Sequence, residues 1–518
     1  MTIRHQRILI STLIVLTLAG LAGQAVAQYL MPPDYTSIFK ADYAGVRLFK
    51  ESLGLGHLGT VSSAAFVQLF RGFTLLTYFS YAGLLLSAHK ANGLDLRRGL
   101  VFVGVVASTV AVLFPPGMSS DVFSYLAYAH MPARHLNPYF TPPSTLIALG
   151  DPVAAYLPHI DPRLPAAGLK WNIPTVYGPV WTMTSSGLSM LGGRSLFAQA
   201  VLLKLLEAGA VMIAAYGAYT IARSTAPLRA PVIFLAVGLN PLLLAEGPGA
   251  GHNDMLMMAL VVLAGGFLVR RLPTRAALVL GAAVGVKVIP ILVVPWMMWE
   301  YRDRLAAPVK LLKAASAFLA PVVLAFVPYW QGPSTLRSIL LRGTVKPTSD
   351  AGLSSTIGTG HAGPTLWTMV HDNAIVVIAY AVLTSMVLLM SRRGGQAVDK
   401  EAQGASVSWA LAWSMMSVIV VYFLLKLLFP WYAIWMWTAA MVSWTRSHLN
   451  LALISSSISL MTSWLYTLSN SAFAGNLICI LLLTTVVLTL VINYFSYACK
   501  INKKTYTVEL CLFYKSAV

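Results

Sequence analysis

The sequence contains few charged residues, and this shortage excludes a whole class of protein. Charged residues make up 10% of its 518 residues, whereas a soluble globular protein carries about 25%. Hydrophobic residues make up 57%, and apolar runs long enough to cross a bilayer as helices recur along the chain. The composition excludes a soluble globular protein and predicts an all-α, polytopic helical membrane protein.

Cysteine is also scarce. The three cysteines, Cys479, Cys499 and Cys511, all lie near the C-terminus, and their spacing fits no zinc site. No disulfide can therefore form within the first 478 residues. The sequence also lacks a convincing internal repeat, which disfavours the transporters that are built from repeated halves.

Acidic residues are outnumbered about two to one. The chain carries 36 Lys and Arg against 17 Asp and Glu, a formal net charge of +19. The basic residues cluster between apolar stretches, as they do in cytoplasmic loops, and no basic patch is interleaved with aromatic residues. This pattern excludes nucleic acid as a partner and favours a lipid bilayer with anionic head groups.

Apolar runs predict most of the membrane crossings, about 12 to 14 helices in all. Two further stretches, 176–192 and 276–299, are ambiguous: the charge pattern closes only if neither crosses fully, or if the charge rule fails locally. If neither stretch crosses fully, the charge pattern predicts the segments on the outer side of the membrane. These are residues 28–63, 116–175, 247–253, 331–373 and 428–430. The predicted spans are 8–27, 64–87, 99–115, 196–222, 230–246, 254–269, 310–329, 374–391, 407–427, 431–445, 449–467 and 473–494.

The chain is expected to form one transmembrane domain over residues 1–497, with a cytoplasmic linker at 394–406 and a basic tail at 498–518. The first apolar run fits either a cleaved signal peptide or an uncleaved helix. We favour the helix, because the chain behind it keeps crossing the membrane. The outer loops 116–175 and 331–373 are long and rich in Pro and Gly, which is typical of functional loops.

Asp121 is the first candidate for chemistry. It follows Pro115-Pro116-Gly117, which ends an apolar helix, and it opens a predicted short helix over 121–131. Asp121, Tyr125 and Tyr128 fall on one face of that helix, which we expect to lie on the membrane surface. The carboxylate either takes part in chemistry or complements the helix dipole, and the local pattern does not separate these two interpretations.

Aromatic and amide side chains follow in the same outer region. Asn137 and Tyr139 stand in His135-Leu136-Asn137-Pro138-Tyr139, and Tyr177 and Trp181 stand in Tyr177-Gly178-Pro179-Val180-Trp181. Each aromatic ring alone fits an interfacial anchor. Together they fit the wall of a site for a sugar or a prenyl chain.

Two polar groups stand at or within apolar helices. His252, Asn253 and Asp254 open the predicted helix 254–269, where Asn253 can cap the helix and backbone N–H groups favour an anion such as phosphate; the alternative is a Gly-rich turn. Lys287 lies inside an apolar stretch, where a buried lysine is a functional candidate. We expect it either to bind phosphate or to extend to the interface.

Further candidates carry weaker signals. Lys204 and Glu207, three residues apart on one helix, predict an internal ion pair. Trp431 and Tyr432 fit either a lipid-phosphate head-group site or an aromatic belt. Arg342 and His361 give the 331–373 loop a basic character, which fits a lid over an anion or a solvated loop.

Taken in order, these motifs resemble the GT-C glycosyltransferases that use polyprenyl-phosphate sugars, in particular the bacterial polyprenol-phosphate-mannose-dependent α-mannosyltransferases. The resemblance runs from about residue 100 to residue 445. Phe123, where the family often has Tyr, and Ala129-His130-Met131-Pro132 depart from the family pattern and leave the choice of acceptor open. The matching segments are Ser120-Asp121-Val122-Phe123-Ser124-Tyr125, Asn137-Pro138-Tyr139, Tyr177-Gly178-Pro179-Val180-Trp181, Gly251-His252-Asn253-Asp254, Lys287-Val288-Ile289-Pro290 and Pro430-Trp431-Tyr432.

The resemblance implies an enzyme of the plasma membrane with its active site on the outer face. It would transfer a hexose, with mannose as the best guess, from a polyprenyl-phosphate donor to a glycan or glycolipid acceptor, with inversion. Asp121 would act as general base, and the sequence shows no metal cluster, although a loosely held divalent cation is compatible with this scheme. The residues expected around the substrates are Tyr125, Asn137, Tyr139, Tyr177, Trp181, His252, Asn253, Asp254, Lys287, Arg342, His361, Trp431 and Tyr432.

Two other classes of function also fit a polytopic protein with buried charges. One is a transporter or flippase of a lipid-linked substrate, which should show repeated halves and a site at the membrane midplane. The other is a non-catalytic scaffold for envelope assembly. Only an enzyme should depend on the carboxylate of Asp121.

Overall fold

The structure is a computed structural model that describes residues 3–35, 43–88, 95–157, 173–225, 227–301, 305–340 and 434–435. Within these ranges every regular element is a helix, and no strand occurs. Six of the helical segments are long and apolar enough to cross a membrane, and two shorter apolar helices accompany them. These observations confirm the predicted all-α, polytopic fold.

The long helices match the apolar runs. Five of the six are α1 (Ile3–Tyr29), α3 (Ser63–Ala88), α4 (Leu96–Leu113), α9 (Leu196–Thr225) and α16 (Pro308–Phe326). The sixth is the segment Pro227–Gly249, and α12 (Asp254–Val269) is one of the two shorter apolar helices. The predicted span 230–246 is interrupted at Asn240, whose side chain accepts hydrogen bonds from the backbone N–H groups of Leu242 and Leu243. It consists of α10 (Ala230–Gly238), α11 (Pro241–Leu244) and the π-helix η5 (Ala245–Gly249). The spans predicted from residue 374 onwards lie outside the described residues, apart from Ile434 and Trp435.

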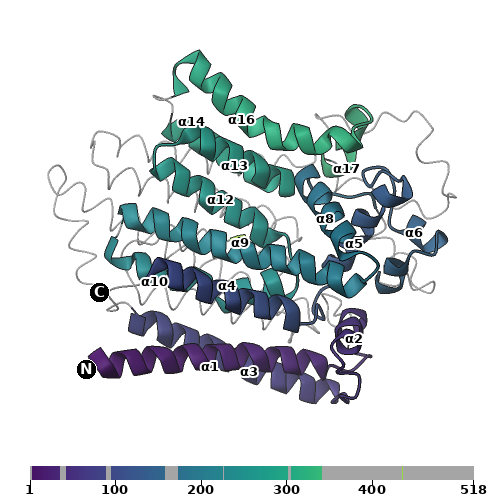
Figure 1. Ribbon diagram of the computed structural model, residues 1–518, viewed down its shortest axis with the longest axis vertical. Helices are drawn as coiled ribbons and strands as arrows, with labels where there is room; N and C mark the ends of the chain where they lie inside the picture. Colours follow the sequence, from purple (N-terminus) through teal and green to yellow (C-terminus); the bar gives the residue numbers. More distant parts are fainter. Residues whose placement is uncertain are drawn as a thin grey trace, which may run out of the picture.

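The long helices lie side by side, and one group of short helices gathers at one end of the bundle (Figure 1). These short helices are α2 (Tyr43–Ser52), α5 (Asp121–His130), α6 (Ser144–Ala148) and α8 (Pro179–Gly192). We refer to this end as the α5 end. α1 packs against α3 as a pair, while α9 packs against α4, α10 and α12.

The ambiguous stretch 276–299 runs from the end of the bundle opposite the α5 end to the α5 end, and then turns back toward the opposite end. α13 (Pro273–Val286) ends before Lys287, whose backbone is extended. Lys287 contacts Asp254 at the start of α12, whereas the Tyr301 hydroxyl, after α14 (Val294–Glu300), donates to the carbonyl of Leu268 at the end of α12. As the charge pattern required, the stretch does not cross as one helix.

The other ambiguous stretch, 176–192, stays at the α5 end. The backbone N–H of Gly178, at the start of α8, donates to the carbonyl of Val286 at 3.0 Å. Beyond the other end of α8, the carbonyl of Gly193 accepts from Gln199, whose side chain also contacts His130 of α5. Both ends of α8 therefore lie near α5, and α8 packs against it.

Candidate active site

Asp121 opens a buried helix. α4 ends at Leu113, and the Pro115-Pro116 turn leads to α5, where the backbone N–H of Asp121 donates to the Ser119 hydroxyl at 3.2 Å. Seven of the ten residues of α5 are buried, on both faces of the helix, so other parts of the protein cover it. α8 and α9 pack against it. The Asp121 side chain itself keeps 13% of its surface exposed.

The predicted aromatic group assembles around Tyr125. The rings of Tyr177 and Trp181 meet the Tyr125 ring edge-on, with centroids 4.9 and 5.0 Å away. The Tyr139 hydroxyl donates to the carbonyl of Tyr177 at 3.2 Å. All four rings are buried, so the alternative that they are interfacial anchors is wrong.

Tyr125 stays protonated in this environment. Burial, together with Tyr177 and the carboxylates of Asp121 and Asp254, raises its pKa well above the ordinary value. Its hydroxyl therefore remains a donor, and it reaches the side-chain oxygen of Asn253 at 3.4 Å. Asn253 precedes α12 as predicted, but its side chain makes no capping hydrogen bond.

His252 lies between two carboxylates. Its Nδ1 is 3.4 Å from an oxygen of Asp121, and its Nε2 is 3.4 Å from an oxygen of Glu246. The imidazole is fully buried, and the Glu246 side chain keeps 9% of its surface exposed. Glu246 belongs to the π-helix η5, an element that is frequent at functional sites.

The turn from η5 into α12 aims His252 at these partners. The backbone N–H of His252 donates to the carbonyl of Glu246 at 3.0 Å. Gly251, one residue earlier, has φ +84°, a conformation that glycine adopts without strain. A Cβ at this position would also lie 3.3 Å from side-chain atoms of Lys204 and Val122. The predicted Gly-rich segment therefore bends the backbone where the imidazole must turn toward Asp121.

Lys287 pairs with a carboxylate of the protein. Its Nζ lies 2.8 Å from Asp254 Oδ1, which also accepts the indole N–H of Trp435 at 2.6 Å. The ammonium lies 5.2 Å from the centre of the Trp435 ring, in cation–π contact. The expectation that Lys287 extends to the interface is wrong, and its predicted contact with a phosphate would have to compete with Asp254.

Lys204 and Glu207 do not form the predicted ion pair, although both are fully buried. The Lys204 ammonium donates to the carbonyl of Phe114 and lies over the ring of Phe49. Glu207 accepts the backbone N–H of Leu256, in the first turn of α12, at 2.8 Å. A carboxylate of the protein therefore already occupies part of the helix N-terminus where we expected an anion.

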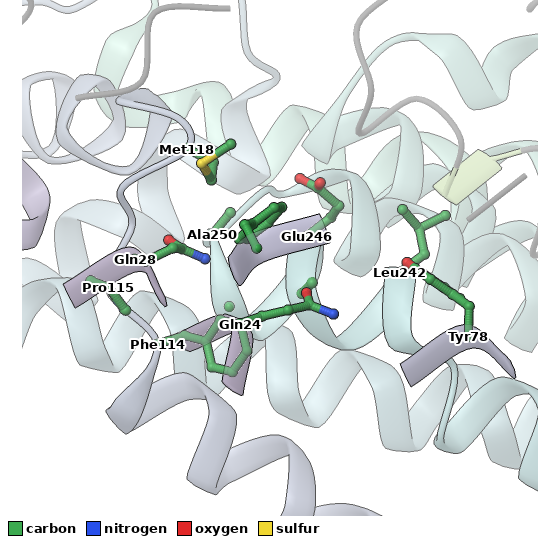
Figure 2. A pocket seen from close by; sticks show the side chains of 12 residues that line it. Gln24, Gln28, Tyr78, Phe114, Pro115, Met118, Leu242, Glu246 and Ala250 are labelled. Atoms are coloured by element: carbon green, nitrogen blue, oxygen red, sulfur yellow. The ribbon is translucent and has the colours of Figure 1, made fainter. Parts of the chain in front are cut away.

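A small polar pocket adjoins the site (Figure 2). Gln24 and Gln28 of α1 and Glu246 of η5 contribute polar side chains to its wall, and Met118 lines it three residues before Asp121. Glu246 thus belongs both to the pocket and to the surroundings of His252.

A second polar cluster holds the outer loop against α5. His130 Nδ1 lies 2.8 Å from Asp151 Oδ1, and Nε2 lies 2.7 Å from the side-chain oxygen of Gln199. Arg134 pairs with the other Asp151 oxygen at 3.2 Å. Burial acts to raise the pKa of Asp151, but hydrogen bonds from His130 and from the backbone of Val153 outweigh burial and hold the pKa below its ordinary value.

The structure brings most of the predicted residues together. Asp121, Tyr125, Tyr177, Trp181, His252 and Asn253 form one connected group, and Asp254 and Lys287 adjoin it. Asn137 uses its side chain on the backbone, since it donates to the carbonyl of Tyr329 and accepts the N–H of Tyr139. The remaining predicted residues, Arg342, His361, Trp431 and Tyr432, lie outside the described residues.

Glu246 and Trp435 are the residues that sequence reasoning missed. An acid within the apolar stretch 230–249 is the signal that would have identified Glu246. Trp435 offered no signal of its own, because it lies in an apolar, aromatic run. In the part of the chain that the structure describes, no group of three His, Cys, Asp or Glu side chains is placed to hold a metal ion.

A polytopic helical bundle with a partly exposed carboxylate beside a buried histidine defines the class as a membrane protein with an enzyme-like site. Residues 44–302 match the family model described as "Alpha-(1->6)-mannopyranosyltransferase, N-terminal domain". The match covers half of the chain and includes Asp121, Glu246, His252, Asp254 and Lys287. The chain belongs to this family, which confirms the resemblance to bacterial α-mannosyltransferases.

Curated relatives carry the same name. Alpha-(1->6)-mannopyranosyltransferase A of Mycobacterium tuberculosis is 25% identical over 354 residues, which cover 64% of this chain and 63% of that protein. A probable alpha-(1->6)-mannopyranosyltransferase of Mycolicibacterium smegmatis is 23% identical over 350 residues, which cover 66% of this chain and 57% of that protein. The matches thus span less than two thirds of these relatives' own length. No solved structure matches the chain.

Proposed function

We propose that this protein is an integral-membrane mannosyltransferase that forms an α-(1→6) linkage on a glycan or glycolipid acceptor. The observation that carries the proposal is the carboxylate of Asp121, partly exposed and 3.4 Å from His252, within the segment that matches the family. The names of the relatives supply the sugar and the linkage.

The proposed reaction is a single displacement. The acceptor hydroxyl loses its proton to Asp121 as its oxygen attacks the anomeric carbon of the donor sugar. The bond from that carbon to the phosphate oxygen breaks, and polyprenyl phosphate leaves with the bonding electron pair. Because the phosphate is a good leaving group, one carboxylate suffices, and the anomeric centre is inverted.

Two buried donors without a partner in the described ranges support a polar ligand near Tyr125. The indole N–H of Trp181 and the amide N–H of Asn253 have no hydrogen-bond acceptor there. Trp181 is 1% exposed and Asn253 is fully buried. A buried donor without an acceptor is costly, and sugar hydroxyl groups would satisfy both donors once a substrate enters.

The polyprenyl-phosphate donor remains a proposal from the resemblance. Lys287 and His252 lie on the α5 side of the bundle, but the described carboxylates of Asp254, Asp121 and Glu246 already face them. Arg342 and His361, the other basic residues that the resemblance places near the donor, lie outside the described residues. The active site would lie on the outer face of the plasma membrane, with the basic helix ends in the cytoplasm.

Replacing Asp121 by Asn tests the proposed function. The change keeps the shape of the side chain and removes its basicity, so transfer should fall by roughly 10²–10⁴-fold, the usual contribution of a general base. The measurement is transfer of radiolabelled mannose from polyprenyl-phosphate mannose to an α-mannoside acceptor, with matched amounts of wild type and variant.

Asp34→Asn is the matched control, because Asp34 is exposed and lies outside the site; this variant should transfer at the wild-type rate. Equal transfer by wild type and Asp121→Asn would remove Asp121 from the mechanism. Absence of transfer by the wild type, together with uptake or flipping of the lipid-linked sugar, would favour the transporter.

A further inference from the structure

The imidazole of His252 cannot make two attractive contacts without help from its partners. A neutral imidazole carries one N–H and one lone pair, yet both buried ring nitrogens lie 3.4 Å from a carboxylate oxygen, at ion-pair distance rather than in hydrogen-bond geometry. A lone pair that faces an ionised carboxylate is repelled by it. Both contacts with these carboxyl groups are attractive only when two protons are shared among Asp121, His252 and Glu246.

The protons have only one distribution that leaves Asp121 ready to act as a base. Asp121 must be ionised, so the nitrogen that faces it, Nδ1, must carry a proton. Nε2 then either carries the second proton toward an ionised Glu246, or accepts the proton of a neutral Glu246. In both states Glu246 keeps the Nδ1 proton directed at Asp121.

We propose that Glu246 is a positioning residue that acts through His252 and fixes its proton on Nδ1, so that Asp121 remains ionised until the acceptor arrives. The inference rests on the proposed transferase function and assigns a role to a residue that the sequence did not single out. Glu246 gains and loses no proton in the transfer step itself, because the acceptor proton ends on Asp121.

The geometry around the imidazole leaves this role to Glu246. Apart from Asp121 and Glu246, the described charged groups near His252 are each engaged elsewhere. Lys204 donates to Phe114, and Glu207 accepts the N–H of Leu256. Asp254 is paired with Lys287. Tyr125 donates to Asn253.

Glu246 lies on the wall of the polar pocket and contacts the imidazole on the nitrogen opposite the one that faces Asp121. Figure 2 shows Glu246 on the pocket wall with Gln24 and Gln28. Asp121 faces the opposite nitrogen of the ring. Glu246 is therefore placed to act on the imidazole of His252, whereas Asp121 is placed to act as the base.

Two substitutions of Glu246 separate the positioning role from a merely structural one. Glu246→Gln can donate an amide N–H to Nε2 and so keeps the proton on Nδ1. Glu246→Met has a similar length but neither donates nor accepts, so Nε2 can take the ring proton and Nδ1 then presents its lone pair to Asp121. This raises the proton affinity of Asp121.

The experiment measures kcat, the KM for the donor and the pH profile of mannose transfer. Glu246→Met should lower kcat by about tenfold or more, since an incorrect histidine tautomer in a catalytic triad costs up to about 10⁴-fold. The acid limb of its kcat profile should move to higher pH, while KM stays unchanged. Glu246→Gln should recover most of the wild-type kcat and the wild-type profile.

Gln6→Met is the matched control, because Gln6 lies near the other end of α1, away from the pocket, and donates to the carbonyl of Ser87; its kcat and pH profile should not change. If kcat falls equally in Glu246→Gln and Glu246→Met, or does not change in Glu246→Met, Glu246 is not a positioning residue. The proposed transferase function still stands in that case, provided that the wild type transfers mannose. A wild type without transfer would refute the proposed function, and the positioning role with it. Each variant is compared at equal amounts of protein that elutes as the wild type does in size-exclusion chromatography.

Discussion

Lys287 and Asp254 form an ion pair that is almost entirely buried, with side-chain exposures of 9% and 0%. Removing one partner of such a pair leaves a charge without compensation. We therefore expect Lys287→Met to lower the free energy of unfolding by about 3–5 kcal/mol. Thermal unfolding in detergent measures this loss.

The double variant Lys287→Gln with Asp254→Asn is the control, because it removes both charges and keeps hydrogen-bonding groups. It should be more stable than Lys287→Met alone. If Lys287→Met instead unfolds like the wild type and only its KM for the donor rises, Lys287 binds phosphate rather than serving the fold.

The sequence identified individual site residues where a polar side chain stands in or beside an apolar membrane helix. Asp121, His252 and Lys287 stood out because each is polar at the end of, or inside, an apolar helix. Their pairings did not follow from the sequence: Asp254 was itself a candidate, but it lies 33 positions from Lys287, and the contact between them depends on where α13 ends. The pairing of Glu246 with His252 depends on the π-helix, which no residue pattern indicated.

At the scale of elements, the break between α13 and α14 follows from one proline. Pro290 has no N–H, and its ring clashes with the carbonyl four residues earlier, which is that of Val286. α13 ends at Val286, so a break was predictable from the sequence. Its consequence, a chain that turns back along α12, depends on tertiary contacts such as that of Tyr301 with Leu268.

The loop that follows α5 is held by Asp151, and its attachment should depend on pH. The folded state depresses the pKa of Asp151, so this carboxylate stabilises the fold above its unfolded pKa of about 3.9. The stabilisation is lost as the pH falls through the lower, folded pKa. At pH 7, Asp151→Asn should lower the free energy of unfolding by about 1–3 kcal/mol.

Thermal unfolding of wild type and Asp151→Asn from pH 7 to pH 3 measures this dependence, and the difference between the two should begin to shrink as the pH falls toward the unfolded pKa of about 3.9 and keep shrinking below it. Asp34→Asn, at an exposed position, should stay within about 0.5 kcal/mol of the wild type. A difference for Asp151→Asn that is constant across this range would show that the carboxylate's charge is not what holds the loop.

At the scale of the whole molecule, the distribution of basic residues predicts the orientation in the membrane. Basic residues lie where helices begin or end away from the α5 end: Arg97 in α4, Arg223 in α9, and Arg270 after α12, whose guanidinium donates to Tyr216 of α9. Cytoplasmic ends carry such an excess of Lys and Arg. The α5 end, with Asp121, should therefore face the outside.

Two single cysteines at opposite ends of the bundle test this orientation, in a background where Cys479, Cys499 and Cys511 are replaced by Ser. Ile147 in α6 at the α5 end is 51% exposed, and Leu228 between α9 and α10 is 83% exposed. A membrane-impermeant maleimide should label Ile147→Cys in intact cells and Leu228→Cys only after the membrane is opened. Because donor and acceptor must meet Asp121 on one face, the reverse pattern would move the proposed transfer to the cytoplasmic side and would require a cytoplasmic acceptor.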